Sequence, residues 1–138
     1  MTGRFFAQRV LSVMLGLAMA GNGIAMLFAG LAWYRAVPGV TQTGPFNPHF
    51  VKDIGAAYLT AGLGLAWFGW RASGFARGLA VAGALFLALH ALIHIVEALG
   101  DPGGPAHLVR DFPGVFLPAL IAIAVVWPLE TSRETAHA

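Results

Sequence analysis

The chain has 138 residues, of which 58% are hydrophobic and 10% are charged, and its formal net charge is +2. Soluble domains hold about 45–50% apolar and about 25% charged residues, and disordered chains have low hydrophobicity, so this composition excludes both a soluble monomer and disorder. The chain has no cysteine, which excludes disulfides, thiolate metal sites, iron–sulfur clusters and c-type haem attachment. Its basic residues are scattered, so we expect no nucleic-acid partner. Residues 1–138 are expected to form one integral membrane domain.

Four apolar runs are long enough to cross a bilayer, which takes about 20 mostly apolar residues in a helix. In chain order they cover residues 10–34, 54–70, 78–96 and 112–129. The predicted fold is therefore all-α, a bundle of four transmembrane helices in the lipid bilayer. We expect Pro113 in the first turn of the last helix and a kink at Pro118. A cleaved secretion signal ending at Ala20 is disfavoured, because the apolar run continues to Tyr34.

Basic residues in the loops set the expected orientation. With the N-terminus inside, five basic residues lie on the inner side and three on the outer side (Arg4, Arg9, Arg71, Arg77 and Arg133 against Arg35, Lys52 and Arg110). Both termini are then cytoplasmic, as expected for a multi-pass protein of a bacterial inner membrane. The Pro- and Gly-rich loops 35–53 and 97–111 would face the outside.

Two segments of similar sequence suggest an internal repeat. Residues 49–54 read HFVKDI and residues 107–112 read HLVRDF, and each leads into an even-numbered span. One interpretation is that the fold consists of two pseudo-repeated helical hairpins of the same topology. The other is that both helices simply need a basic residue at the interface and an apolar start. A true repeat would place Asn22 opposite His90.

Ionisable side chains near the membrane interior are costly, so each is a functional-site hypothesis. His90, His94 and Glu97 are spaced i, i+4 and i+7, which confines them to about 60° of one helix face. Other histidines and carboxylates are expected on the same outer half of the molecule (His49, His107, Asp53, Asp101 and Asp111). This gathering of imidazoles and carboxylates predicts a metal site near the outer face.

In this hypothesis His90 and His94 are the core metal ligands. The remaining ligands come from His49, His107 and Glu97. Asp53 and Asp111 would either bind the metal themselves or orient the rings through the pairs His49–Asp53 and His107–Asp111. Nitrogen and oxygen donors without sulfur suit zinc, copper or iron, and also nickel or manganese. Haem between spans is disfavoured, because histidines occur within the apolar run of the third span alone. Asn22 would either orient a ligand or donate a hydrogen bond between helices.

Purely structural roles for the same residues remain open. His90 and His94 would then hydrogen-bond to neighbouring helices, and Asp111 would pair with a basic residue such as Arg110. The functional hypothesis is a membrane protein whose His/carboxylate site binds a transition metal or a small polar ligand, with a redox association. The alternative is a non-catalytic accessory or assembly subunit of a larger membrane complex, or of a homo-oligomer. The sequence identifies no substrate and no reaction, and a transport pathway would require oligomers.

The stretch from Lys52 to Leu59, KDIGAAYL, followed by Gly62 and Gly64, resembles the start of the second span in DoxX-like small membrane proteins. The resemblance covers this stretch and the four-span plan. It implies a compact four-helix fold, and some members of that family are similar to subunits of quinone-linked oxidoreductases. Members that work through paired cysteines cannot be the template, since this chain has none. No catalytic residue is carried over.

Overall fold

The computed structural model describes residues 3–127, and all the regular secondary structure in that range is helical. In chain order the elements are α1 (Gly3–Phe28), α2 (Gly30–Ala36), the 3-10 helix η1 (Val40–Gln42), α3 (Pro48–Arg71), α4 (Gly74–Leu99), α5 (Gly104–Asp111), the π-helical turn η2 (Phe112–Phe116) and α6 (Leu117–Val126). The prediction of an all-α chain is confirmed for these residues.

Three helical stretches are long and apolar enough to cross a membrane: Gly3–Phe28, Gly74–Leu99 and Gly104–Val126. The third combines α5, η2 and α6. Helix α3 has 24 residues but is not among the three. The structure is thus consistent with a membrane protein, although it has three such helices where the sequence predicted four.

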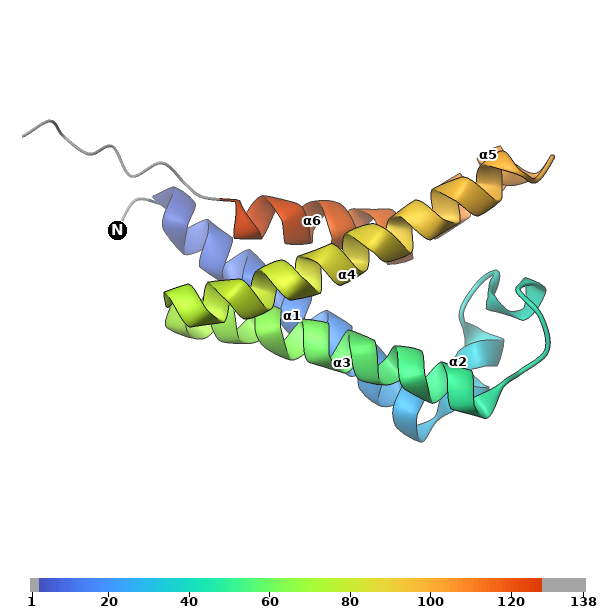
Figure 1. Ribbon diagram of the computed structural model, residues 1–138, viewed down its shortest axis with the longest axis horizontal. Coiled ribbons are helices and arrows are strands. Elements are labelled where there is room, and N and C mark those ends of the chain that lie inside the picture. The colour runs from blue at the N-terminus through green and yellow to red at the C-terminus, as the bar shows by residue number, and fades with distance from the viewer. Residues whose placement is uncertain (1–2, 128–138) are drawn as a thin grey trace, which may run out of the picture.

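The helices form two pairs that diverge from one end of the molecule (Figure 1). Helices α1 and α3 lie together, and α6 lies along α4. Helices α3 and α4 meet at the turn 72–73, from which they spread apart. We call this the terminal end, because α1 begins there and α6 ends there. The opposite end, with the loop 37–47 and the turn 100–103, is called the loop end.

Glycines let α1 and α3 approach so closely that their backbones touch. A Cβ built on Gly62 would lie 2.6 Å from the carbonyl oxygen of Gly16, and a Cβ on Gly23 would lie 2.5 Å from that of Gly55. A Cβ on Gly69 would likewise lie 2.6 Å from the carbonyl oxygen of Arg9. The contact residues recur every seven positions on both helices and pair in opposite order. Helices α1 and α3 are therefore antiparallel and held by small-residue packing.

Polar side chains satisfy helix carbonyls at the terminal end. The last carbonyls of a helix have no partner within it, so side-chain donors stabilise them. Arg9 donates a hydrogen bond to a carbonyl oxygen at the end of α3, whereas Gln8 and Arg77 donate to carbonyl oxygens at the end of α6. The bonds are Arg9 Nε to Gly69 O (2.8 Å), Gln8 Nε2 to Val125 O (2.6 Å) and Trp127 O (3.0 Å), and an Arg77 Nη to Val126 O (3.0 Å). The start of α1 and the end of α6 are thereby joined.

Several predicted boundaries are corrected by the structure. The first run is not one helix to residue 34, because the helix breaks at Ala29 (φ −130°, ψ 36°) and α2 follows. The predicted loop 97–111 is mostly helical, since α4 continues to Leu99 and α5 covers the second part. Helix α3 begins at Pro48, six residues before the predicted start of the second span, because the Asn47 side chain accepts bonds from two backbone N–H groups.

The prolines of the last span also act differently from the prediction. Pro113 is not in a first turn, because the helical stretch already starts at Gly104. The irregularity expected at Pro118 lies just before it, in the π-helical turn η2. Pro118 has no N–H to bond the carbonyl of Gly114, and the wider turn accommodates this loss. Residues 128 and 129 of the predicted span lie outside the described residues.

Candidate functional site

Helix α4 brings His90 and His94 together on one face, as the i, i+4 spacing predicts. Their ring centroids are 4.8 Å apart, and the rings are inclined by 67°. His90 also packs edge-on against Tyr58 of α3, with centroids 5.7 Å apart, and stacks with Phe86 of its own helix at 6.2 Å. Both histidines are half-buried. The face of α4 that carries them is therefore turned toward α3 and surrounded by aromatic rings.

His94 is paired with Asp111. Its Nδ1 lies 2.8 Å from Asp111 Oδ2, and the two side chains are 24% and 10% exposed. Asp111 ends α5, and the π-helical turn that follows brings Phe116 against the same imidazole, with centroids 6.5 Å apart. An ionised carboxylate at Nδ1 favours the tautomer in which Nδ1 carries the proton and Nε2 keeps its lone pair.

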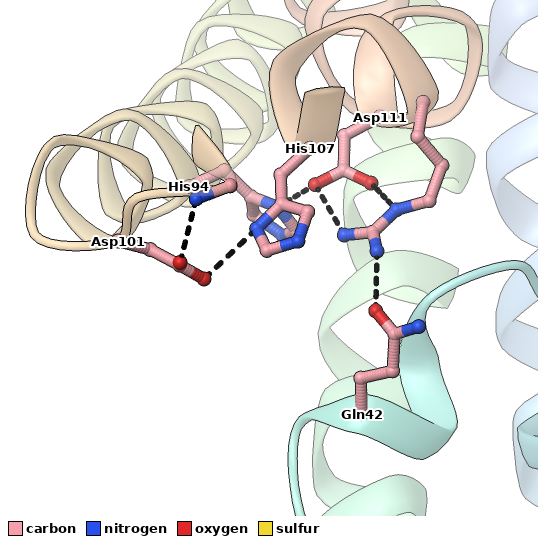
Figure 2. A network of polar contacts seen from close by, with 7 residues as sticks. Gln42, His94, Asp101, His107 and Asp111 are labelled. Carbon is pink, nitrogen blue, oxygen red and sulfur yellow. Dashed lines mark hydrogen bonds and ion pairs between the residues drawn. The ribbon is translucent and has the colours of Figure 1, made fainter. Parts of the chain in front are cut away.

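Arg110 extends this pair to the loop end (Figure 2). Its Nε donates to Asp111 Oδ1 at 2.7 Å, and one Nη donates to Asp111 Oδ2 at 3.3 Å. The other Nη donates to Gln42 Oε1 at 2.7 Å. A continuous polar chain therefore runs from His94 on α4 through Asp111 and Arg110 of α5 to Gln42 beside the loop 37–47. Pairing of Asp111 with Arg110 agrees with the structural interpretation of the sequence.

Of the two predicted His–Asp pairs, the one on α5 is wrong. His107 does not pair with Asp111; its Nδ1 lies 3.3 Å from Asp101 Oδ2 instead. Asp101 lies in the turn just before α5, six residues before His107, whereas Asp111 contacts His94 of α4. The pair His49–Asp53 does form, at 3.5 Å, but it is well exposed, at 88% and 62%.

Within residues 3–127, no group of three or more His, Asp and Glu side chains is placed to hold a metal ion. The five predicted ligands do not converge, because His49 and His107 have their own carboxylate partners. Glu97 shares the stripe with His90 and His94 but is exposed, and in the described range it forms no ion pair. The site is thus reduced to two imidazoles and one carboxylate.

Asn22 has a structural contact of its own. Its Oδ1 accepts a hydrogen bond from Trp33 Nε1 at 2.8 Å, and its Nδ2 lies 3.6 Å from Met26 Sδ. The bond joins α1 to α2, so Asn22 is an interhelical partner as predicted, although it is the acceptor from Trp33. Of the two predicted roles, a bond between helices is the one observed.

Three contributors to the site were not predicted: Tyr58, Phe116 and Gln42. Tyr58 lies one helical turn after Ile54, on the side of α3 that faces α4, and helical periodicity relative to Ala61 would have placed it there. Gln42 carries no local signal, because only the folding of the loop 37–47 toward α5 brings it to Arg110.

No protein-family model, no curated protein and no solved structure matches the chain. The relationship to DoxX-like proteins therefore stays a prediction, and the chemistry of the site rests on its own geometry.

Proposed function

We propose that the chain is a four-helix membrane domain with a His/carboxylate ligand site at its loop end. Helix α3 is the fourth span in this proposal. Its 24 residues would reach about 36 Å at 1.5 Å per residue, and it is packed between α1 and α4. Its exposed tryptophans, Trp67 and Trp70, lie near the terminal end, where aromatic residues commonly mark a membrane interface.

The contact that carries the proposal is the 2.8 Å approach of His94 Nδ1 to Asp111 Oδ2. A histidine that binds a metal almost always donates its other ring N–H to a carboxylate, a carbonyl or a water, which orients the ring and raises its basicity. His94 has this arrangement, and His90 lies one turn away. Two imidazoles without sulfur suit zinc, copper or iron, with water or a small polar ligand completing the coordination.

Elemental analysis of detergent-purified protein tests this site. Protein loaded with Zn²⁺, Cu²⁺ or Fe²⁺ and then desalted should retain close to one metal per chain. The double variant His90→Ala/His94→Ala should lose it while keeping its helical circular dichroism. The matched control His49→Ala/His107→Ala removes two imidazoles outside the site and should keep the metal. Retention of metal in both double variants would place the metal elsewhere, and loss in both would contradict a site made of His90 and His94 without His49 and His107.

A separate variant tests the role of Asp111. Asp111→Asn should weaken metal affinity by about 10–100-fold, as is typical when the carboxylate behind a ligating histidine is removed. Absence of metal after loading with all three ions would refute metal binding. The proposed ligand would then be a small polar molecule that hydrogen-bonds to His90 and His94.

The membrane orientation belongs to this proposal as well. Arg4 and Arg71 are exposed near the terminal end, and an excess of basic residues is typical of the cytoplasmic side. We infer that the terminal end is cytoplasmic and that the site faces the outside of a bacterial inner membrane. A membrane-impermeant thiol reagent should label Gln42→Cys in intact cells and should not label Ser73→Cys.

A second candidate function, an accessory subunit, is favoured by a groove between α4 and α6. The groove encloses about 410 Å³ and is almost entirely apolar. Exposed apolar side chains line it, and a partner helix could pack on them (Leu92, Leu120 and Ile123). Leu120→Ala, on the exposed side of the groove, should then reduce the yield of a larger complex in mild detergent without changing the metal content. An unchanged complex size would argue against this role.

A further inference from the structure

We propose that Arg110 is a latch that couples the position of the loop 37–47 to the geometry of His94. One guanidinium holds the loop against α5 and also fixes the carboxylate that orients the imidazole. The loop would thereby regulate the ligand site. This inference rests on the proposed function only for what the site binds, because the coupling itself is a property of the free protein.

The loop 37–47 forms one unit with α2. Tyr34 donates a hydrogen bond from its hydroxyl to Gly44 O at 2.6 Å, and the Tyr34 ring lies 5.4 Å from that of Phe46. The bond from Trp33 to Asn22 in turn holds α2 against α1. Movement of the loop is therefore coupled to α2, which the break at Ala29 separates from α1.

The contact between the loop and α5 is narrow and depends on one side chain. Within residues 3–127, the bond from Arg110 to Gln42 is the only hydrogen bond that joins the loop to α5, η2 or α6. The same guanidinium lies directly on Gly39. A Cβ built on Gly39 would lie 2.5 Å from Arg110 Nε, and Gly39 has a φ of +85°. The backbone of the loop thus forms the surface on which the guanidinium rests.

Arg110 transmits the position of the loop because its donors are shared. Its guanidinium reaches both oxygens of Asp111 as well as Gln42. The Oδ2 atom it approaches is the one that contacts His94 Nδ1. If the loop leaves, Arg110 loses an acceptor and its packing surface, and the Asp111 carboxylate becomes free to turn away from His94.

Spin labelling measures the loop directly, since the chain has no cysteine to remove. Spin labels are attached to Thr41→Cys in the loop and to Val109→Cys in α5, which are both exposed positions. Pulsed electron paramagnetic resonance in nanodiscs then measures the distance between the loop and α5. Nitrogen-15 shifts of the His94 ring report its tautomer in the same protein. Both readouts are taken without metal or ligand. The two readouts therefore test the latch even if the metal hypothesis fails. Metal binding without the latch would fail the distance test alone.

Two variants disturb the latch. Arg110→Gln removes the positive charge and some of the N–H donors of the guanidinium, and Gly39→Ala adds a Cβ where the guanidinium contacts the loop. Gly44→Ala is the matched control. Gly44 also has a positive φ, +130°, but a Cβ there would meet nothing within 4 Å. We expect one narrow distance distribution in the parent. Gly44→Ala strains the loop backbone without touching Arg110, so it should leave the His94 tautomer signal unchanged. Arg110→Gln and Gly39→Ala should give a longer and broader distribution, together with a shifted His94 tautomer signal.

Arg110→Lys keeps the charge but cannot bridge Gln42 and both Asp111 oxygens. Its distribution of distances between the loop and α5 should therefore lie between those of the parent and of Arg110→Gln. Unchanged distances in Arg110→Gln and Gly39→Ala would overturn the latch. A loop that opens while the His94 ring signal stays unchanged would also overturn it, because the coupling to the site would be absent.

Discussion

Gly62→Ala tests the close contact between α1 and α3. The added Cβ would lie 2.6 Å from Gly16 O, whereas ordinary contacts begin at 3.4 Å, a difference of about 0.8 Å. The atoms that the added Cβ would meet are backbone atoms of α1, so the helices must separate or shift, because no side chain can rotate away. Overpacking of this kind costs about 1–3 kcal/mol.

Helix propensity acts in the opposite direction. Replacing a glycine within a helix by alanine stabilises it by about 0.5–1 kcal/mol. Gly62→Ala should therefore lower the free energy of unfolding by up to about 2.5 kcal/mol. The matched control is Gly21→Ala, where a Cβ would meet nothing within 4 Å and the propensity gain should appear alone. The difference between the two variants isolates the overpacking cost.

The assay is equilibrium unfolding in mixed micelles, followed by far-ultraviolet circular dichroism. The double variant Gly16→Ala/Gly62→Ala should lose less stability than the sum of its two single variants, since helices already separated by one Cβ accommodate the second more easily. Equal stabilisation in Gly62→Ala and Gly21→Ala would refute the close antiparallel contact. Strict additivity of the two single variants would show that Gly16 and Gly62 do not share one crossing point.

Three further substitutions have defined expectations. Ser12→Ala removes the buried 2.7 Å bond to Leu65 O and should lower the unfolding free energy by about 0.6–2 kcal/mol, whereas an unchanged value would remove this bond from the α1–α3 contact. Trp33→Phe deletes the donor to Asn22; it should cost about 0.5–1.5 kcal/mol and increase hydrogen exchange in α2, and unaltered exchange there would contradict the role of this bond. His49→Ala breaks an exposed pair and should change stability by less than about 0.5 kcal/mol, so a larger loss would mean that this pair is buried in the membrane-bound protein.

Composition and local spacing were enough to predict the helical character of the chain and one half of the site. An apolar content this high leaves few alternatives to helices that satisfy their own backbone in lipid. His90 and His94 lie on one face because 100° per residue places i and i+4 together, whatever surrounds the helix. Asn47 caps α3 for an equally local reason, since its side-chain oxygen accepts from the N–H groups two and three residues later, those of His49 and Phe50.

Contacts between residues distant in the sequence were not predicted, because they depend on how the helices dock. Asp111 has a local histidine one turn before it, His107, yet it pairs with His94 because α5 docks on α4 and turns that carboxylate inward. The seven-residue spacing of Gly55, Gly62 and Gly69 is visible in the sequence, but its meaning depends on the matching positions of α1.

The sequence by itself determined the elements with short-range causes: apolar helices, their caps and the faces on which polar residues lie. Tertiary structure alone decided which of those faces meet. The break at Ala29 folds α2 back toward Asn22, and the loop after it then reaches Arg110. Contacts between residues as distant as Gln42 and Arg110 depend on the packing of several helices at once, which no local pattern encodes.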